Sequence, residues 1–347
     1  MQNLNRQVVL RSRPRGEPRP SDFELAEAPV PAPGEGEILC RTIYLSLDPY
    51  MRGRMDEGRS YTGGMNPALG SVMVGGTVSE VIASRNPAFP EGSFVLGANG
   101  WQAYALSRGA GLRTLDPRQA ALSTALGVLG MPGMTAYVGL LDIGRPKPGE
   151  TVVVSAAAGA VGSVVGQLAR LKGCRAVGVA GSDEKRAYVV KELGFDACVN
   201  YKSGALRPAL REACPNGIDV YFDNVGGDVL AAALTLINLR ARIPLCGLIS
   251  QYSAIEPPAG PNLRPVLTNR ALIQGFIVSD HMDRLADFLD ECTRWFRDGK
   301  LKYREDVVIG LERAPEAFIG LLRGQNFGKL LVKVGEDPTA RAVGPRA

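Results

Sequence analysis

The stretch 151–185, TVVVSAAAGAVGSVVGQLARLKGCRAVGVAGSDEK, decides the fold of this 347-residue chain. Its first residues, 151–154, are β-branched and apolar, which is typical of a parallel strand covered on both faces. A turn of small residues follows, and then an apolar stripe at helical spacing that ends at Gly173. A second apolar strand is expected over 175–180. This order of strand, turn, helix and strand predicts a βαβ unit that holds phosphate at its turn.

The small-residue turn matches part of the GxGxxG pattern of dinucleotide-binding folds. Gly159 and Gly162 stand at the second and third glycine positions, and Ala157 replaces the first. Without a Cβ, Gly159 lets backbone approach a pyrophosphate that the helix N-terminus stabilises, and Gly162 lets the helix pack on the strand. An ordinary strand-to-helix turn is the alternative, but the flanking strand and helix favour a nucleotide site.

The residues after the second strand favour NADP over NAD. NAD-binding folds usually carry an Asp or Glu there, which binds the ribose 2′-hydroxyl and would repel a 2′-phosphate. This chain has Gly181, Ser182 and Lys185 instead, and a hydroxyl and an ammonium would attract that phosphate. Alternatively, Ser182 caps the next helix and Lys185 is solvated. Both roles can hold together.

Length and composition indicate a globular protein of about two domains. The formal net charge is only +5, and Lys and Arg are scattered without an aromatic-interleaved basic run, so we expect no nucleic acid partner. No stretch approaches the roughly 20 apolar residues of a membrane span, and the N-terminus lacks the order of a signal peptide. We expect no membrane association and a cytoplasmic location.

Cysteine and histidine usage argues against disulfides and metal. The six cysteines are far apart and form no CxxC pair, so we expect reduced thiols in the core. A zinc site needs convergent ligands that a chain with one histidine cannot easily supply, and a Ser-His-Asp triad would have to use His281. We expect a capping or surface role for His281, and no bound metal.

The chain changes pattern near residue 123. The earlier part is rich in Pro and Gly, with strand-like segments at 37–45, 72–82 and 93–97. From 151 onward, strands and helices alternate as in a doubly wound α/β domain. The six expected strands are 151–154, 175–180, 197–200, 218–222, 242–245 and 272–278. Pro244 cannot donate to the ladder, so we expect its strand to be short or bulged there.

The last part of the chain is expected to return to the first domain. A helix near 282–298 is followed by strand-like segments at 307–309 and 329–334. The tail from Gly335 is polar and contains Pro and Gly, so we expect it to be disordered.

Small and polar residues follow the third, fourth and fifth expected strands, where open α/β sheets bind ligands. Tyr201 can reach the phosphate-bearing ribose, or be a simple strand-end aromatic. Asn224, in DNVGG, can bind a ribose or carboxamide, or belong to a capped turn. In CGLISQY, 246–252, glycine allows close backbone approach, and Tyr252 would stand beside the nicotinamide.

The ordered motifs AAAGAVG, GSDEK, NYK, DNVGG, CGLISQY and QNFGKLLVK resemble the zinc-independent medium-chain dehydrogenase/reductases. Within them the chain is similar to the leukotriene B4 12-hydroxydehydrogenase/prostaglandin reductase group, which includes alkenal double-bond reductases and curcumin-reductase-like enzymes. SLDPYMRGRM, 46–55, and GMPGMTAYVGL, 130–140, are further hallmarks, and the likeness covers nearly the whole chain.

The resemblance implies an α/β fold, a Rossmann doubly wound parallel sheet plus a GroES-like β domain. The implied parts are a substrate and catalytic domain at 1–127, an NADP-binding domain at 128–304, a return at 305–334 and a tail at 335–347. It also implies a homodimer with its active site in the interdomain cleft. Zinc-dependent relatives place metal ligands where this chain has Ser46, Leu47 and Asp48, in agreement with the histidine count.

The resemblance also assigns parts of the cofactor to residues. It implies that the turn 159–162 receives the pyrophosphate, 246–252 the nicotinamide side and 276–278 the carboxamide, with Asn326 as a closing contact. The expected NADP-binding residues, from the motifs and the resemblance together, are Met131, Thr135, Gly159, Ala160, Val161, Gly162, Ser182, Lys185, Tyr201, Asn224, Cys246, Gly247, Leu248, Ile249, Ser250, Tyr252, Phe276, Ile277, Val278 and Asn326.

The implied reaction is conjugate reduction of an α,β-unsaturated ketone or aldehyde, in which charge accumulates on the carbonyl oxygen. Tyr252 is the expected donor to that oxygen, beside the nicotinamide ribose hydroxyl. Tyr50 and Tyr61 are expected substrate contacts, with core packing and a surface position as their respective alternatives. Arg52 and Arg54 would attract a substrate carboxylate, or more simply form salt bridges.

Two other functions stay open at this point. One is a quinone reductase of the same superfamily, and the other is a non-catalytic NADPH-binding protein. Alcohol oxidation is a poorer choice, because without zinc or a convincing base nothing polarises the alcohol.

Overall fold

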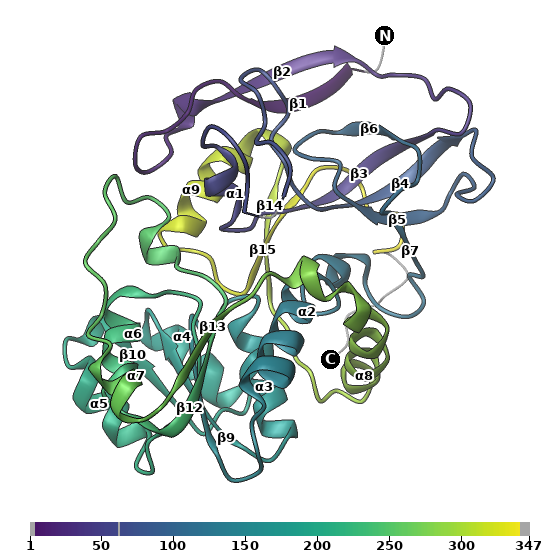
Figure 1. Cartoon of the computed structure of the whole chain (residues 1–347). Coiled ribbons are helices and arrows are strands. Elements are labelled where there is room, and N and C mark those ends of the chain that lie inside the picture. Colours follow the sequence, from purple (N-terminus) through teal and green to yellow (C-terminus); the bar gives the residue numbers. More distant parts are fainter. Residues whose placement is uncertain (1–3, 62, 341–347) are drawn as a thin grey trace. The chain divides into compact units, whose positions relative to one another are not determined.

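The structure, a computed structural model, describes residues 4–61 and 63–340 and divides the chain into two compact units. Unit 1 comprises Met1–Gly127, Glu305–Asn326 and Leu330–Ala347, and unit 2 comprises Val128–Arg304 and Phe327–Lys329. Figure 1 shows the elements of both. A mixed α/β chain with a parallel sheet in one part and a largely antiparallel sheet in the other matches the expected fold class.

Unit 2 is built on a six-stranded sheet in which every pair of neighbours is parallel. Its order is β10-β9-β8-β11-β12-β13, so the chain winds outward from the centre in both directions. The strands are β8 (Thr151–Ser155), β9 (Arg175–Ala180), β10 (Ala197–Asn200), β11 (Ile218–Phe222), β12 (Ile237–Leu245) and β13 (Leu272–Gly275). This is the order of a dinucleotide-binding fold, and it confirms the doubly wound prediction.

Helices lie on both sides of this sheet, α5 and α6 on one and α2 and α3 on the other (Figure 1). The first face buries Val153, Val177 and Tyr221 against them, and each such side chain contributes roughly 1.5–3 kcal/mol. The helices are α2 (Met131–Val138), α3 (Gly162–Leu171), α4 (Asp183–Lys191), α5 (Leu206–Ala213), α6 (Gly227–Leu234), α7 (Arg264–Thr268) and α8 (Leu285–Arg297).

The fifth and sixth strands differ from their predicted bounds. β12 begins five residues earlier than expected, and its pairing with β11 shifts between Ile237 and Arg242, where Arg240 has a left-handed φ of 61°. The irregularity therefore lies before Pro244, which pairs with Gln274 in the regular part of the strand. The expected break at Pro244 was wrong in position. β13 ends at Gly275, three residues before its predicted end, and a 3-10 helix begins at Val278 and runs to Arg284.

Unit 1 holds a seven-stranded sheet and a separate two-stranded ribbon. The sheet order is β14-β15-β3-β4-β5-β7, with β6 paired to β3. The strands are β1 (Leu4–Leu10), β2 (Phe23–Pro29), β3 (Ile38–Ser46), β4 (Thr77–Ser84), β5 (Phe94–Gly97), β6 (Tyr104–Ser107), β7 (Arg113–Leu115), β14 (Glu305–Ile309) and β15 (Lys329–Lys333). Two helices, α1 (Met51–Arg54) and α9 (Ala314–Leu322), complete it.

The core of unit 1 contains three aromatic rings from distant parts of the sequence. Phe23 stacks on Trp101 with ring centroids 5.6 Å apart, and Phe318 of α9 meets both rings edge-on. Aromatic pairs of this geometry add about 0.5–1.5 kcal/mol beyond their burial. The C-terminal return is thus part of the core of unit 1.

The tail from Gly335 was expected to be disordered. Its first residues are instead bonded to β3, with Gly335 N–H donating to the Ile43 carbonyl and the Tyr44 hydroxyl donating to Asp337. Residues 341–347 lie outside the described part of the chain.

Within the described residues, each helix is too short or too polar to cross a bilayer. The six cysteines form no disulfide with one another, and all except the partly exposed Cys246 are buried. Burial raises the pKa of every thiol, to about 11 for Cys40 and Cys174 and to about 12 for the rest. These thiols stay protonated at neutral pH.

Candidate functional site

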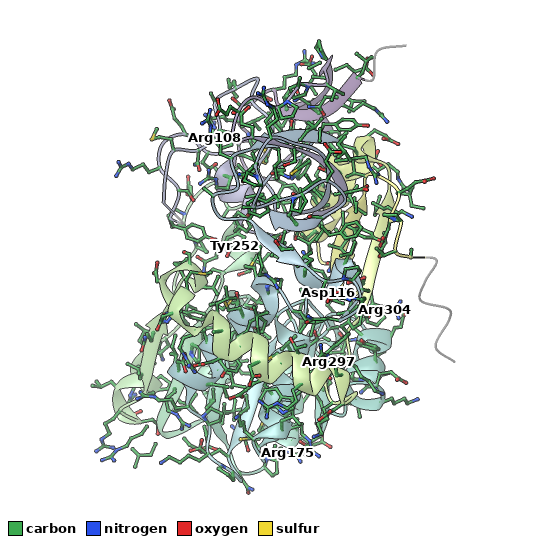
Figure 2. The ribbon with its side chains drawn as sticks, turned by 90° about the vertical axis from the view of Figure 1, so that its right-hand side faces the viewer. Arg108, Asp116, Arg175, Tyr252, Arg297 and Arg304 are labelled. Carbon is green, nitrogen blue, oxygen red and sulfur yellow. The ribbon has the colours of Figure 1, made fainter. Side chains whose placement is uncertain are left out.

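The unit 2 candidates gather at one edge of the parallel sheet. The turn at Gly159, Ser182, Tyr201, Asn224 and the 246–252 loop each follow the carboxyl end of a different strand, β8 to β12. Figure 2 shows Tyr252, which follows a strand, at one end of unit 2, and Arg175, the first residue of β9, at the opposite end. Open parallel sheets bind ligands at this carboxyl edge.

The turn between β8 and α3 has the close packing expected of its glycines. A Cβ on Gly162 would lie 2.4 Å from the Ala156 carbonyl oxygen, so only glycine fits there. A Cβ on Gly159 would approach Ala156 alone, at 3.1 Å from its oxygen, and the space around it is otherwise open. Ala156 takes the left-handed conformation, with φ 52°. The open space at Gly159 fits a phosphate close to backbone.

A segment distant in sequence packs against this turn. Gly328 donates its N–H to the Ala158 carbonyl, 3.1 Å away, and pairs with Gly159 as an isolated bridge. The guanidinium of Arg304, labelled in Figure 2, lies 3.9 Å from the Phe327 ring centroid. The three residues Phe327–Lys329 belong to unit 2 for this reason.

The tip of β9 carries the groups expected to meet a 2′-phosphate. Ser182 caps α4, since its hydroxyl accepts the N–H of Lys185 at 3.2 Å. The Tyr201 ring covers Gly181: a Cβ there would lie 3.2 Å from Cε1 and 3.5 Å from the hydroxyl. The Lys202 side chain crosses the same spot, with its Nζ 5.8 Å from the Tyr201 ring centroid. The tip is basic and hydroxylated, and the capping alternative for Ser182 is present as well.

The 246–252 loop is folded back on itself. The Tyr252 hydroxyl accepts the N–H of Leu248 at 3.4 Å and lies 3.0 Å from the position of a Cβ on Gly247. Glycine at 247 is therefore what lets the Tyr252 hydroxyl approach the backbone. Ser250 fastens the loop to its neighbour by donating its hydroxyl proton to the Val225 carbonyl at 2.6 Å.

The remaining unit 2 candidates flank this edge. Met131 and Thr135 share one turn of α2, where the Thr135 hydroxyl donates to the Met131 carbonyl at 2.8 Å. Phe276 is buried and meets Phe222 edge-on, with centroids 6.1 Å apart. Ile277 and Val278 are partly exposed. His281 lies in the 3-10 helix that begins at Val278, with its ring centroid 6.4 Å from that of Phe276, and it is partly exposed.

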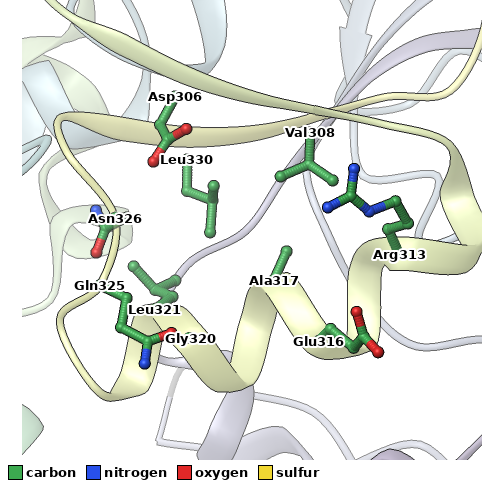
Figure 3. A pocket seen from close by; sticks show the side chains of 10 residues that line it. All are labelled: Asp306, Val308, Arg313, Glu316, Ala317, Gly320, Leu321, Gln325, Asn326 and Leu330. Atoms are coloured by element: carbon green, nitrogen blue, oxygen red, sulfur yellow. The ribbon is translucent and has the colours of Figure 1, made fainter.

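Tyr50, Tyr61 and Asn326 belong to unit 1. Tyr50 precedes α1 and packs against the core, as its alternative foresaw; burial and then the charge of Asp48 raise the pKa of its hydroxyl. Tyr61 is 57% exposed. Asn326 borders a hollow of about 220 Å³ between α9 and β14 (Figure 3). The hollow is lined by Asp306, Val308, Arg313, Glu316, Ala317, Gly320, Leu321, Gln325, Asn326 and Leu330.

The two arginines of the DPYMR segment are structural. Arg52 is buried, donates to the carbonyls of Pro14 and Gly16, and pairs with Asp56 at 2.6 Å. Arg54 donates to the carbonyls of Gly63 and Met65. Both guanidinium groups donate to backbone carbonyls, and the salt-bridge alternative describes Arg52. Nearby, the Ser46 hydroxyl donates to Asp48. In the described part of the chain, no three His, Cys, Asp or Glu side chains converge as metal ligands.

Sequence reasoning missed the side chains beneath the loops. Asp223, at the start of DNVGG, is fully buried and bonded to Ser155 and Tyr221. A signal was present, since an acid directly after an apolar strand and before NVGG is an uncommon choice for a buried position.

Two family comparisons cover most of the chain. Residues 6–115 match the family described as the N-terminal domain of oxidoreductase, and residues 160–294 match the family described as zinc-binding dehydrogenase. An NADPH-dependent curcumin reductase of Escherichia coli (strain K12) is 51% identical over 339 residues, which is 96% of this chain and 98% of that protein. Prostaglandin reductase 1 of Rattus norvegicus is 45% identical over 92% of this chain and 95% of its own length.

The chain belongs to the medium-chain dehydrogenase/reductases. A solved structure of this family, CurA of Vibrio vulnificus in complex with NADPH, superposes with a TM-score of 0.91 at 50% sequence identity, covering 96% of this chain and all of that one. The family resemblance read from the motifs is therefore confirmed, together with the fold it implied.

Proposed function

We propose that this chain reduces the carbon–carbon double bond of α,β-unsaturated ketones and aldehydes with NADPH. The relatives are named as reductases, of curcumin in one case and of prostaglandins in another, and one solved relative is a complex with NADPH. The observation that carries the proposal is the tip of β9, where Gly181 stands in place of an acid and lies under the Tyr201 ring. Lysine side chains of α4 and of the 201–203 turn supply the positive charge.

The residues at the sheet edge fit this cofactor. Gly159 leaves room for the pyrophosphate beside the α3 N-terminus, and the β9 tip has a cap hydroxyl, a phenol and ammonium groups for the 2′-phosphate. When bound, NADPH supplies a hydride to the β-carbon of the substrate. Phosphate recognition at one end and the 246–252 loop at the other would fix which way the cofactor lies.

Tyr252 is the proposed donor to the substrate carbonyl oxygen. Its own oxygen accepts the Leu248 N–H, and an accepted hydrogen bond polarises a hydroxyl so that it donates more strongly. A donor held in place acts when negative charge develops on the carbonyl oxygen, which lowers the barrier. Tyr50 and Tyr61 are proposed substrate contacts. We propose that no zinc takes part.

We also propose a homodimer formed through unit 2. β13 is an edge strand of the parallel sheet, and exposed leucines lie on it and next to it. Leu272 on β13 is 42% exposed, and Leu267 on α7 is 79% exposed; they are brought together by the bond from Ala271 N–H to the Val266 carbonyl. A second copy related by a two-fold axis would cover both. L267K/L272K should therefore elute as a monomer, whereas the unchanged chain should have twice that mass by light scattering.

The cysteine thiols favour a reducing compartment. Six unpaired cysteines, most of them buried, are usual in cytosolic proteins and unusual in secreted ones. We therefore propose a cytoplasmic location. Tagged chain should appear in the cytosolic fraction.

The activity is tested by following the loss of absorbance of the reduced nicotinamide as the cofactor is oxidised. Purified chain is mixed with NADPH or NADH and with 3-nonen-2-one, 2-nonenal or a quinone, and the product is analysed for the saturated carbonyl. We expect NADPH oxidation with both enone and enal, and a much slower rate with NADH. Turnover with the quinone alone would indicate a quinone reductase. Tight NADPH binding without any turnover would indicate a non-catalytic binding protein.

A further inference from the structure

Asp223, the residue after β11, is a fully buried carboxylate at the carboxyl edge of unit 2. Its Oδ1 accepts four hydrogen bonds: from the hydroxyls of Ser155 and Tyr221 at 3.0 and 2.9 Å, and from the N–H groups of Val225 and Gly226, both at 3.0 Å. Its Oδ2 is buried and has no partner among the described residues. A buried carboxylate with one oxygen unsatisfied is costly, so stability alone does not account for it.

The backbone of Asp223 joins two strand ends. Its N–H donates to the Pro244 carbonyl at 2.9 Å, and its carbonyl accepts the N–H groups of Cys246 and Gly247 at 2.8 and 3.1 Å. The backbone of Asp223 therefore holds the first two residues of the 246–252 loop in place by hydrogen bonds. The carboxylate charge also reaches this loop: after burial, it is the second cause that raises the Cys246 pKa to about 12.

A second connection runs from Asp223 through Ser155 to Asn224. The Ser155 hydroxyl donates to Asp223 and accepts the Asn224 N–H at 2.8 Å, while the Asn224 side-chain Nδ2 donates to the Ser155 carbonyl at 2.8 Å. With Nδ2 occupied, the amide has one orientation, and its Oδ1 is the atom that remains to accept from a ligand. Among the described residues no donor reaches that oxygen.

We propose that Asp223 is a positioning residue, whose carboxylate orients Asn224 and the 246–252 loop toward the cofactor. It touches neither substrate nor cofactor, and it acts through Ser155, the 225–226 amides and the base of the loop. The inference rests on the proposed function, because it takes that loop and Asn224 to be where the reduced ring binds.

Asp219 provides a matched control. It lies at the opposite end of the same strand, accepts the Thr151 N–H at 2.8 Å through one oxygen, and accepts the Asn238 Nδ2 at 2.8 Å through the other. Its substitution removes two structural hydrogen bonds at the end of the strand away from the carboxyl edge. D223L, D223N and D219L are compared in three measurements: the NADPH dissociation constant, kcat and KM for 3-nonen-2-one, and the unfolding midpoint.

We expect D223L to weaken NADPH binding by about tenfold, equivalent to one lost hydrogen bond of about 1.4 kcal/mol. The fold-decrease in kcat for D223L should be larger than the fold-change in its KM for 3-nonen-2-one. D223N keeps a carbonyl oxygen that can accept the two amides, so it should recover most of the binding. D219L should also lower the unfolding midpoint, because it removes two structural hydrogen bonds, but its NADPH binding should stay within about twofold of the unchanged chain.

Equal loss of NADPH binding in D219L and D223L would overturn the proposal, because Asp223 would then be only structural. If D223L does not fold, S155A removes the relay hydroxyl alone and should weaken NADPH binding; unchanged binding there would also overturn it. NADPH affinity is measured without substrate. If the chain binds NADPH but reduces no enone, the proposed reaction is contradicted. The NADPH dissociation constants of D223L and D219L still test the role of Asp223 in that case.

Discussion

Tyr252 lies in the loop after β12, with its hydroxyl against Gly247 and the Leu248 amide. Removing one donor from a well-formed oxyanion site costs roughly 3 to 4 kcal/mol of barrier, and the ribose hydroxyl of the cofactor would share this role. We therefore expect Y252F to lower kcat by about 10- to 100-fold, without abolishing turnover. Steady-state kinetics at saturating NADPH measure this.

The control for this substitution is Y303F, a half-exposed tyrosine of unit 2 outside the strand-end loops. It should retain the kcat of the unchanged chain. A Y252F enzyme with undiminished kcat would remove Tyr252 from the mechanism.

Lys185 lies in the first turn of α4, beside the tip of β9. Its ammonium should bind the 2′-phosphate, so K185A should raise the KM for NADPH by roughly tenfold and leave the KM for NADH nearly unchanged. The contrast between the two cofactors separates phosphate recognition from general damage. K191A, at the other end of the same helix, should leave both values as they are. Equal KM values for NADH and NADPH in the unchanged chain would show that the role given to Lys185 is wrong.

At the scale of elements, the strands of unit 2 were predictable because they are buried on both faces. β9, β10 and β11 have their predicted bounds, and β8 is one residue longer. Continuous apolar runs bounded by turn residues carry this signal in the sequence itself. β12 was harder, since its early part is bent at Arg240, where a non-glycine residue takes a left-handed conformation that only tertiary pairing explains.

In unit 1, the sequence did not predict β1, β2, β6 or β7. β2 has the burial pattern of an exposed ribbon, and β7 is three residues long, so neither shows a clean alternation of apolar and polar residues. The segment 72–76, assigned to one strand with 77–82, instead runs beside β1, with Met73 N–H bonded to the Val8 carbonyl. Partners distant in sequence decided these elements.

The candidate site shows the same division. Motif residues at strand ends could be placed on the carboxyl edge from strand order alone. Asp223, Ser155 and the Gly328 contact could not, because a buried carboxylate, a strand serine and a distant glycine acquire their roles only when three strand ends and two chain segments meet.

Gly166 in α3 allows packing and helix propensity to be compared. Alanine favours a helix over glycine by about 1 kcal/mol, but a Cβ at 166 would lie only 1.8 Å from the Phe195 ring. Overpacking typically costs about 1–3 kcal/mol, so G166A should lower the free energy of unfolding despite its better propensity. Chemical denaturation measures this. G53A, in α1 with no atom within 4 Å of its Cβ, should be neutral or slightly stabilising; the same result for G166A would contradict the packing argument.

At the scale of the whole molecule, the chain passes between its units at Gly127, Arg304, Asn326 and Lys329. Unit 1 is completed only by the C-terminal segment, because β15 pairs with β3, Leu331 opposite Ser46. The return to the first domain follows from this pairing. The brief passage of Phe327–Lys329 through unit 2 places a segment from near the C-terminus beside the turn at Gly159, so residues far apart in the sequence build this part of the candidate site.

The protonated, mostly buried thiols have a consequence for an enzyme of this kind. Enals and enones are Michael acceptors that alkylate thiolates, so an enzyme that binds them can be inactivated by modification of its own cysteines. Every cysteine here has a pKa of about 11 or 12 because of burial. We expect chain incubated with 2-nonenal at pH 7.5 without NADPH to carry no cysteine adduct by intact mass, whereas S203C, with an added thiol at an exposed position, should gain one. A cysteine adduct on the unchanged chain would contradict this. The burial that forms the two hydrophobic cores would then also protect the cysteines from alkylation by the substrates.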